Sequence, residues 1–307
     1  MRLSRVIPFF ACTAVVIGFL VANAQEPGGD DVRGAFISSR PKTTDPNAPP
    51  RRHQRRRQTT TGSNASMSVT TTTTTKSATA NKPTNATKTT TENQPKTLGP
   101  IGLGYTLFMR DEFGKPMRVD PAHEFHTGDR VRLSLEPNID GYLYIFDSED
   151  GGPPQMIFPD ARLDSGYNDV DAHVPIEIPS SEQSDERLRW FQFYGKPGQD
   201  RIYIVVTREP LPGVPTGETL VSYCAANKDK CPWRPPATVW AQIQLGARAD
   251  VHVVTSGQFG QPQSNAEVVA TTRGLGLDQT APQPSVIRMS VSTTAPVLVT
   301  ALDLNHR

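Results

Sequence analysis

The sequence predicts an all-β fold over residues 101–307 of the 307-residue chain, either an antiparallel β-sandwich of the immunoglobulin-like kind or an open barrel. Short apolar runs with a period of two recur along this part of the chain, and Gly, Pro and Asp separate them. One of these runs is apolar on both faces, which is typical of a strand at the centre of a layered fold. A short two-helix insertion and a preceding disordered arm complete the expected organisation.

The clearest alternation lies in residues 130–136. Val131, Leu133 and Leu135 fall on one face, and we expect the polar residues between them to face water. Asp140-Gly141 then predicts a hairpin turn into Tyr142–Phe146, the run that is apolar on both faces. The same pattern predicts further strands at Tyr105–Met109, Met156–Phe158, His173–Ile178, Trp190–Tyr194, Arg201–Thr207, Val251–Val254, Val286–Val291 and Val297–Leu304.

Residues 215–245 interrupt the strands with a predicted helical insertion. Thr216 is the expected N-cap of a first helix, and Thr238–Leu245 forms a second short one. After removal of a leader, Cys224 and Cys231 are the two remaining cysteines, and in an oxidising compartment an even count favours a disulfide over an incomplete zinc site. Residues 246–285 are mainly a Gln-, Gly- and Pro-rich long loop, and residues 286–307 supply the last strands.

The first 24 residues resemble a secretory signal peptide. Arg2 and Arg5 precede an apolar run that ends near Val21, and Ala22-Asn23-Ala24 supplies the small residues that signal peptidase requires. Cleavage is therefore expected between Ala24 and Gln25, which places the protein outside the cytoplasm, in the periplasm or secreted. An uncleaved membrane anchor is the alternative. No later stretch is apolar and long enough to predict a transmembrane helix.

Residues 25–100 form the predicted arm, with 12 Lys/Arg against 5 Asp/Glu and a long Thr-rich tract. Too few apolar residues are present to offset the entropy of ordering the backbone. The densest charge comprises Arg51, Arg52, Arg55, Arg56 and Arg57. This cluster is either part of a solvated linker or a contact for an anionic surface; the lack of aromatic residues beside it argues against nucleic acid.

No catalytic constellation emerges from the sequence, and it predicts no catalytic residue, cofactor or metal. His123 and His126 are three residues apart and lead into a strand, so they do not match a helical zinc pair. A nucleophile elbow and a phosphate-binding loop are both missing. The weak binding candidates are four aspartates in one polar loop, which could collect a hard cation: Asp160, Asp164, Asp169 and Asp171.

Five segments recur in a fixed order between residues 124 and 210: Phe125–Leu133, Asp140–Phe146, Ile157–Asp160, Ile176–Pro179 and Val205–Leu211. As a set they resemble a bacterial family, the DUF4384 domain of unknown function. Together with the leader, the low-complexity arm and the helical cysteine insertion, they look like secreted acidobacterial members. The resemblance implies a β-rich extracytoplasmic module that elsewhere accompanies peptidase-like or kinase-like domains, and it supplies no catalytic residues.

These observations favour an exported, non-enzymatic binding module of the cell envelope. Residues 101–307 carry 18 basic and 26 acidic residues, so we expect this acidic domain to contact an envelope protein or glycan. One alternative is a hydrolase acting through Asp and Glu, with Asp160 and Asp164 as its candidates. Another is an accessory subunit of a separately encoded peptidase or kinase.

Overall fold

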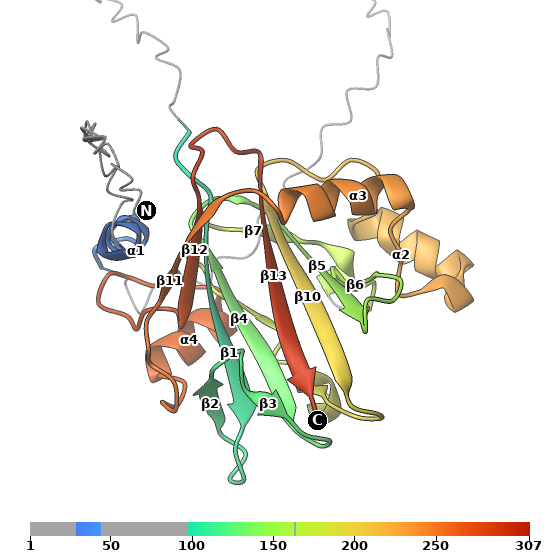
Figure 1. The fold of residues 1–307 in the computed structure, drawn as a ribbon, viewed down its shortest axis with the longest axis horizontal. Helices are drawn as coiled ribbons and strands as arrows, with labels where there is room; N and C mark the ends of the chain where they lie inside the picture. The colour runs from blue at the N-terminus through green and yellow to red at the C-terminus, as the bar shows by residue number, and fades with distance from the viewer. Residues whose placement is uncertain (1–28, 44–97, 163) are drawn as a thin grey trace, which may run out of the picture.

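The computed structural model describes residues 29–43 and 98–307, apart from residue 163 (Figure 1). Within these residues the chain forms two separate sheets, of seven and six strands, and the neighbouring strands are antiparallel except for one short parallel pair. This arrangement confirms the antiparallel sandwich rather than an open barrel.

Sheet A has the order β11-β12-β1-β4-β8, and β2 and β9 are paired to β1 and β4. Its strands are β1 (Gly102–Arg110), β2 (Pro116–Val119), β4 (Arg130–Pro137), β8 (Ile176–Ile178), β9 (Phe191–Gln192), β11 (Val251–Thr255) and β12 (Val286–Ser290).

Sheet B has the order β3-β13-β10-β5-β6, and β7 is paired to β5. Its strands are β3 (Glu124–Phe125), β5 (Gly141–Glu149), β6 (Gln155–Phe158), β7 (Asp169–Val170), β10 (Gly198–Thr207) and β13 (Val297–His306).

The core lies between the sheets and follows the predicted alternation. Val131, Leu133 and Leu135 of β4 belong to the same buried cluster as Leu143 and Ile145 of β5. Removing this apolar surface from water is the main favourable contribution to folding. Most predicted strands are confirmed, although His173–Ile178 and Trp190–Tyr194 contribute only short strands.

The turn at residues 138–141 is not a hairpin, because β4 lies in sheet A and β5 in sheet B. The chain passes here from one sheet to the other. Gly141 is required at this point, since an added Cβ would lie 2.1 Å from the carbonyl oxygen of Thr207. The Asp-Gly pair therefore marks a sharp change of direction, and the sequence does not distinguish a hairpin from this crossing.

Sheet B is covered on its outer face by an apolar layer, here named the apolar cover. It consists of α2 (Gly217–Ala226), α3 (Ala237–Gly246) and the segment between them, which includes η3 (Lys228–Lys230). Leu220, Trp233 and Ile243 pack with Tyr144 and Phe146 of β5 in a second buried cluster. The disulfide between Cys224 and Cys231 lies in this insertion and is confirmed. Thr216 is the N-cap residue of α2, but its side chain makes no capping hydrogen bond.

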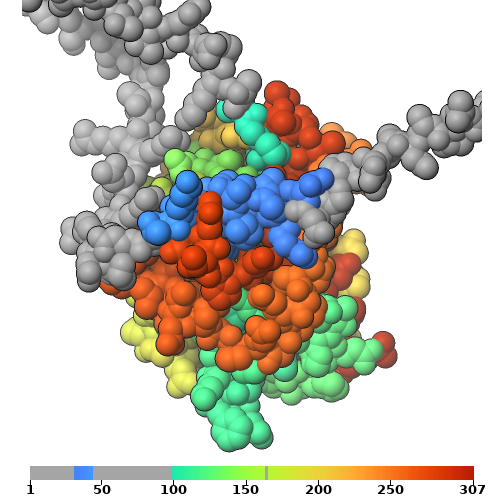
Figure 2. All heavy atoms as spheres, turned by 90° about the vertical axis from the view of Figure 1, so that its left-hand side faces the viewer, coloured from blue at the N-terminus to red at the C-terminus, as the bar shows by residue number. Residues whose placement is uncertain are grey.

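Sheet A is covered by residues 29–43, α4 (Asn265–Arg273) and the loop 276–285, here named the polar cover. Its helix α1 (Gly29–Ser38) packs Val32 and Phe36 against residues of β11 and β12. Figure 1 shows α1 and α4 on the opposite side of the molecule from α2 and α3, and Figure 2 shows residues 29–43 lying across that face.

The polar face of β4 does not face water, contrary to the expectation from its alternation. Arg132, Ser134 and Glu136 are buried because the polar cover lies over them. Each buried charge has a partner of opposite sign. The ion pairs of this face are Arg40–Glu136 at 2.7 Å, Arg118–Glu267 at 2.5 Å and Arg132–Glu177 at 3.2 Å.

Two segments expected to lack regular structure contain helices. The stretch Gly29–Ser38 lies in the predicted disordered arm, yet it forms α1, so that expectation is wrong for these residues. Within the predicted long loop 246–285, α4 begins with a capping box between Ser264 and Glu267 and ends at Gly274. The cleavage site at Ala24 and Gln25 lies outside the described residues, as do the arginine cluster 51–57 and the rest of the arm.

Candidate functional site: a groove along the open side of the sandwich

A groove runs along the side of the sandwich where the two sheets are not joined. The edge strand β6 of sheet B forms one wall, and β8 and β9 of sheet A form the other. Two cavities of about 570 and 850 Å³ adjoin here and share Ile157, Trp190 and Phe191 in their lining. A cavity of this size can hold several side chains or sugar units.

The middle of the groove is apolar. Ile157, Ile176 and Phe191 are only partly buried and pack against the main core. Arg132 forms a cation–π contact with Trp190, and its guanidinium carbon lies 4.0 Å from the ring centroid. At the rim, the Tyr194 side chain is 79% exposed. The floor is thus a rigid aromatic and aliphatic surface that a partly apolar ligand could cover.

One end of the groove is acidic because the inward-facing side chains of sheet B change there from apolar residues to carboxylates. Along β5, Ile145 points into the core, and two and four residues later the same face carries Asp147 and Glu149. Asp200 on β10 is directly opposite Glu149 in the strand register. Three carboxylates therefore share the mouth of the sandwich, on the face that is otherwise packed with Ile and Leu.

Asp147 is the most perturbed of these acids. Burial raises the pKa of its carboxyl to about 6, and the neighbouring charges of Asp200 and Glu149 act in the same direction. Its Oδ2 accepts a hydrogen bond from Gln155 at 3.4 Å. Its Oδ1 is buried and has no hydrogen-bond partner among the described residues. The pKa of Asp200 is also raised, mainly by burial. A cation placed here would relieve both effects.

Asp150 and His306, near the same end, have structural partners. Asp150 accepts a hydrogen bond from the backbone N–H of Gln199 at 2.8 Å, which holds the start of β10. The His306 Nε2 lies 3.0 Å from the Thr127 hydroxyl. The acids available to a ligand are therefore Asp147, Glu149 and Asp200.

The structure disperses the four aspartates of the sequence prediction. Asp160 and Asp171 line the other end of the groove, where Asp160 is paired with Arg162. Asp169 lies in β7 and is not part of either cavity lining. Asp164 begins the short η1 (Asp164–Gly166). Within the described part of the chain, no three His, Cys, Asp or Glu residues are placed to hold a metal ion.

The acidic end of the groove is not among the sites predicted from the sequence. The available signal was the alternation itself: Asp147 follows Ile145 by two residues and so shares the core-facing side of β5. The pairing of Asp200 with Glu149 needs the strand register, which the sequence does not reveal.

The fold and the groove define a helix-covered β-sandwich with a ligand-sized cleft between its sheet edges. Residues 124–210 match the family described as Domain of unknown function (DUF4384). Neither the curated proteins nor the solved structures contained a match to the chain. The matched segment supplies β6, β8 and β9, so it contributes both groove walls, whereas most of the two covers lies outside it.

Among the described residues, no helix combines the length and the apolar character needed to cross a bilayer.

Proposed function

We propose that the protein is an extracytoplasmic binding module, and that its groove holds an extended segment of an envelope protein carrying Lys or Arg between apolar residues. The single observation that carries this proposal is the change from an apolar floor to a row of inward-facing carboxylates along one continuous groove. An ammonium or guanidinium group would pair with Asp147 and Asp200, while the apolar residues of the ligand would cover Ile157 and Phe191.

The proposed location outside the cytoplasm is supported by a disulfide in the same chain. The Cys224–Cys231 disulfide fits an oxidising environment. The leader adds the finer proposal of a periplasmic or secreted protein that is cleaved after Ala24. The arginines of the arm would add contact with an anionic surface, and an accessory role beside a peptidase or kinase is compatible with a peptide-binding groove.

A protein segment fits the groove better than a neutral glycan. Partly buried carboxylates discriminate in favour of cations, and a neutral sugar would leave Asp147 unpaired. The aromatic floor accepts apolar side chains without further hydrogen bonds. A glycan therefore becomes one outcome of the test rather than part of the proposal.

The test is fluorescence anisotropy of the exported chain with a labelled peptide in which Arg and Lys alternate with Leu and Tyr. We expect binding that Asp147→Asn/Asp200→Asn weakens by at least about tenfold. The control is Asp303→Asn, which changes one charge on the outer face of the same sheet, where Asp303 pairs with Arg201. A peptide with Glu in place of the basic residues should not bind.

Other results would overturn the proposal. If the basic peptide failed to bind, or if the double variant bound as the wild type does, the groove would not be a cation-selective site. Preferential binding of a glucosamine oligomer would show that the groove binds glycans and not basic peptides. Cleavage of the peptide, lost in Asp147→Asn, would favour the hydrolase, because a carboxyl whose pKa is about 6 suits general acid–base catalysis.

A further inference from the structure

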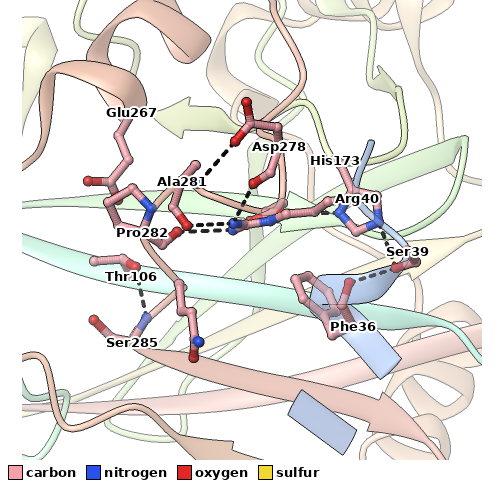
Figure 3. Close-up of polar contacts among 12 residues, drawn as sticks. Phe36, Ser39, Arg40, Thr106, His173, Glu267, Asp278, Ala281, Pro282 and Ser285 are labelled. Carbon is pink, nitrogen blue, oxygen red and sulfur yellow. Dashed lines mark hydrogen bonds and ion pairs between the residues drawn. The ribbon is translucent and has the colours of Figure 1, made fainter. Parts of the chain in front are cut away.

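Residues 29–43 bring a serine to a buried histidine on the opposite side of sheet A from the groove. The Oγ of Ser39 lies 2.8 Å from Nε2 of His173 (Figure 3). Nδ1 of His173 lies 2.8 Å from Oε1 of Glu136. The three side chains come from the polar cover, the segment before β8 and the end of β4. Sequence spacing alone does not indicate that they meet.

The charge of Glu136 determines the tautomer of His173. Arg40 donates two hydrogen bonds to Glu136, at 2.8 and 2.7 Å, and the two side chains form a buried ion pair. A carboxylate accepts hydrogen bonds only, so the Nδ1 of His173 carries the proton that lies between the two groups. In the neutral form of the imidazole, Nε2 is an acceptor that faces the Ser39 hydroxyl at 2.8 Å. The single proton of that hydroxyl has the carbonyl of Phe36, at 2.7 Å, as its other acceptor.

The base and its acid are rigidly held, whereas the serine is accessible. His173 is 2% exposed, and its backbone N–H and C=O are bonded to Pro137 and Leu277 at 2.7 and 2.8 Å. Its φ of 59° lies in the left-handed region that a non-glycine residue adopts at a cost. Phe36 packs edge-on against its ring at 5.3 Å. Ser39 is exposed.

Arg40 fixes the acid from the other side. Besides Glu136, its guanidinium donates to the carbonyls of Asp278, Ala281 and Pro282 at 3.0–3.2 Å, as Figure 3 shows. All five of its N–H donors are therefore used. The arrangement of nucleophile, base and orienting acid has the hydrogen-bond order of a serine hydrolase relay.

We propose that Ser39 is an activated nucleophile, with His173 as its general base and Glu136 as the positioning residue. Oγ attacks the carbonyl carbon of a carboxylic ester while its proton passes to Nε2. Collapse of the tetrahedral intermediate breaks the ester C–O bond, and the leaving alcohol takes the proton from Nε2. Water then attacks the acyl-serine with His173 again as base, which releases the carboxylic acid and restores the hydroxyl.

The surroundings of Ser39 determine how a substrate would reach it. Ser39 is exposed and lines neither cavity of the groove, so an ester would approach it from the protein surface. The backbone N–H groups of Ser39 and Arg40 donate to Ala35 and Ile37, and so they are not directed at a developing oxyanion. Because missing oxyanion donors cost about 10² to 10³ in rate, we expect slow turnover and a readily trapped acyl or phosphonyl serine.

The experiment is stoichiometric labelling of the exported chain with a fluorophosphonate, in which Oγ attacks phosphorus, fluoride leaves and the proton passes to His173. Peptide mass spectrometry should locate the label on Ser39. Ser39→Ala should abolish it. Ser38→Ala is the matched control, because among the described residues the Ser38 hydroxyl donates to the carbonyl of Ala35 at 3.2 Å, and this variant should be labelled as the wild type is.

His173→Gly separates a base from a structural role. Glycine adopts φ near 59° without strain, so the backbone is preserved while the imidazole is removed. We expect labelling to slow at least about a hundredfold and to be restored by added imidazole. An unlabelled wild type, a label at another residue, or an unchanged rate in His173→Gly would each overturn the proposal. Failure of imidazole to restore labelling in a folded His173→Gly variant would do the same.

Discussion

The two covers each bury the outer face of one sheet, but one does so mainly with apolar side chains and the other also with buried charged side chains. The apolar cover packs Leu220, Trp233 and Ile243 on sheet B, with the chain between them closed by a disulfide. The polar cover adds buried ion pairs to its apolar contacts with sheet A, and Arg40–Glu136 is the most enclosed of these pairs. In an apolar cover the cost of a change follows the buried volume that is lost, because dispersion contacts are many and individually weak. A cover built on buried charges depends on every partner being present.

The largest effect is expected where a buried charge loses its partner. Glu136→Gln leaves the Arg40 guanidinium buried without its carboxylate, and it should lower the free energy of unfolding by about 3 to 5 kcal/mol. Urea denaturation followed by circular dichroism measures this. The double variant Arg40→Met/Glu136→Gln should be more stable than Glu136→Gln alone. Strictly additive losses in this cycle would show that the pair is not energetically coupled.

An intermediate effect is expected in the apolar cover. Leu220 is 1% exposed, and Leu220→Ala should cost about 3 kcal/mol through lost burial and the cavity that remains. This loss should be nearly independent of salt and of pH between 5 and 8, because the substitution removes no charge. Val221→Ala is the control on the same helix, because Val221 is exposed and should change the unfolding free energy very little. A strong salt dependence of the Leu220→Ala loss would contradict the claim that the apolar cover is stabilised by apolar burial and not by charge.

The smallest effect concerns a carboxylate that neither cover protects. The folded pKa of Asp147, about 6, exceeds that of an unfolded Asp, about 4, so the folded state binds the extra proton between these values. The free energy of unfolding therefore falls as pH rises through this window, and above it the loss stays constant. Asp147→Asn should stabilise the protein by about 1 kcal/mol at pH 8, after discounting for solvent screening in the open groove.

The same substitution should change little at pH 4, where Asp147 is already protonated in the folded state. Thermal denaturation at the two pH values, with Asp303→Asn as the exposed control, measures the difference. Destabilisation by Asp147→Asn at pH 8 would mean that the carboxylate has a favourable partner in the folded protein.

The sequence predicted those parts of the fold in which alternation and burial coincide. Leu133 and Ile145 each fall on an inward face, and the strands that carry them were predictable from a period of two. The same period in β4 identifies two chemically different faces, but it cannot tell solvent from a second buried layer. Arg132 and Glu136 were therefore expected to face water, since their partners lie 45 and 96 residues away in the chain.

Local signals existed for part of what remained. Ser264 and Glu267 have the spacing of a capping box, which a search for helix starts would have found in the predicted loop. Val32 and Phe36 are spaced for one helical face, but the surrounding composition obscured them. The groove depends on two sheet edges that are not paired to each other. Asp147 and Asp200 meet only through strand register, which is a tertiary property.

Docking of residues 29–43 has a topological consequence for the intervening chain. Arg40, within the polar cover, is paired with Glu136 of sheet A, and β1 of the same sheet starts at Gly102. The two ends of the chain segment 44–97 therefore join the same domain. A single protease cut within residues 44–97 would leave the short N-terminal piece held by its own salt bridge and helix packing. Such a cut would therefore not by itself separate residues 29–43 from the sandwich.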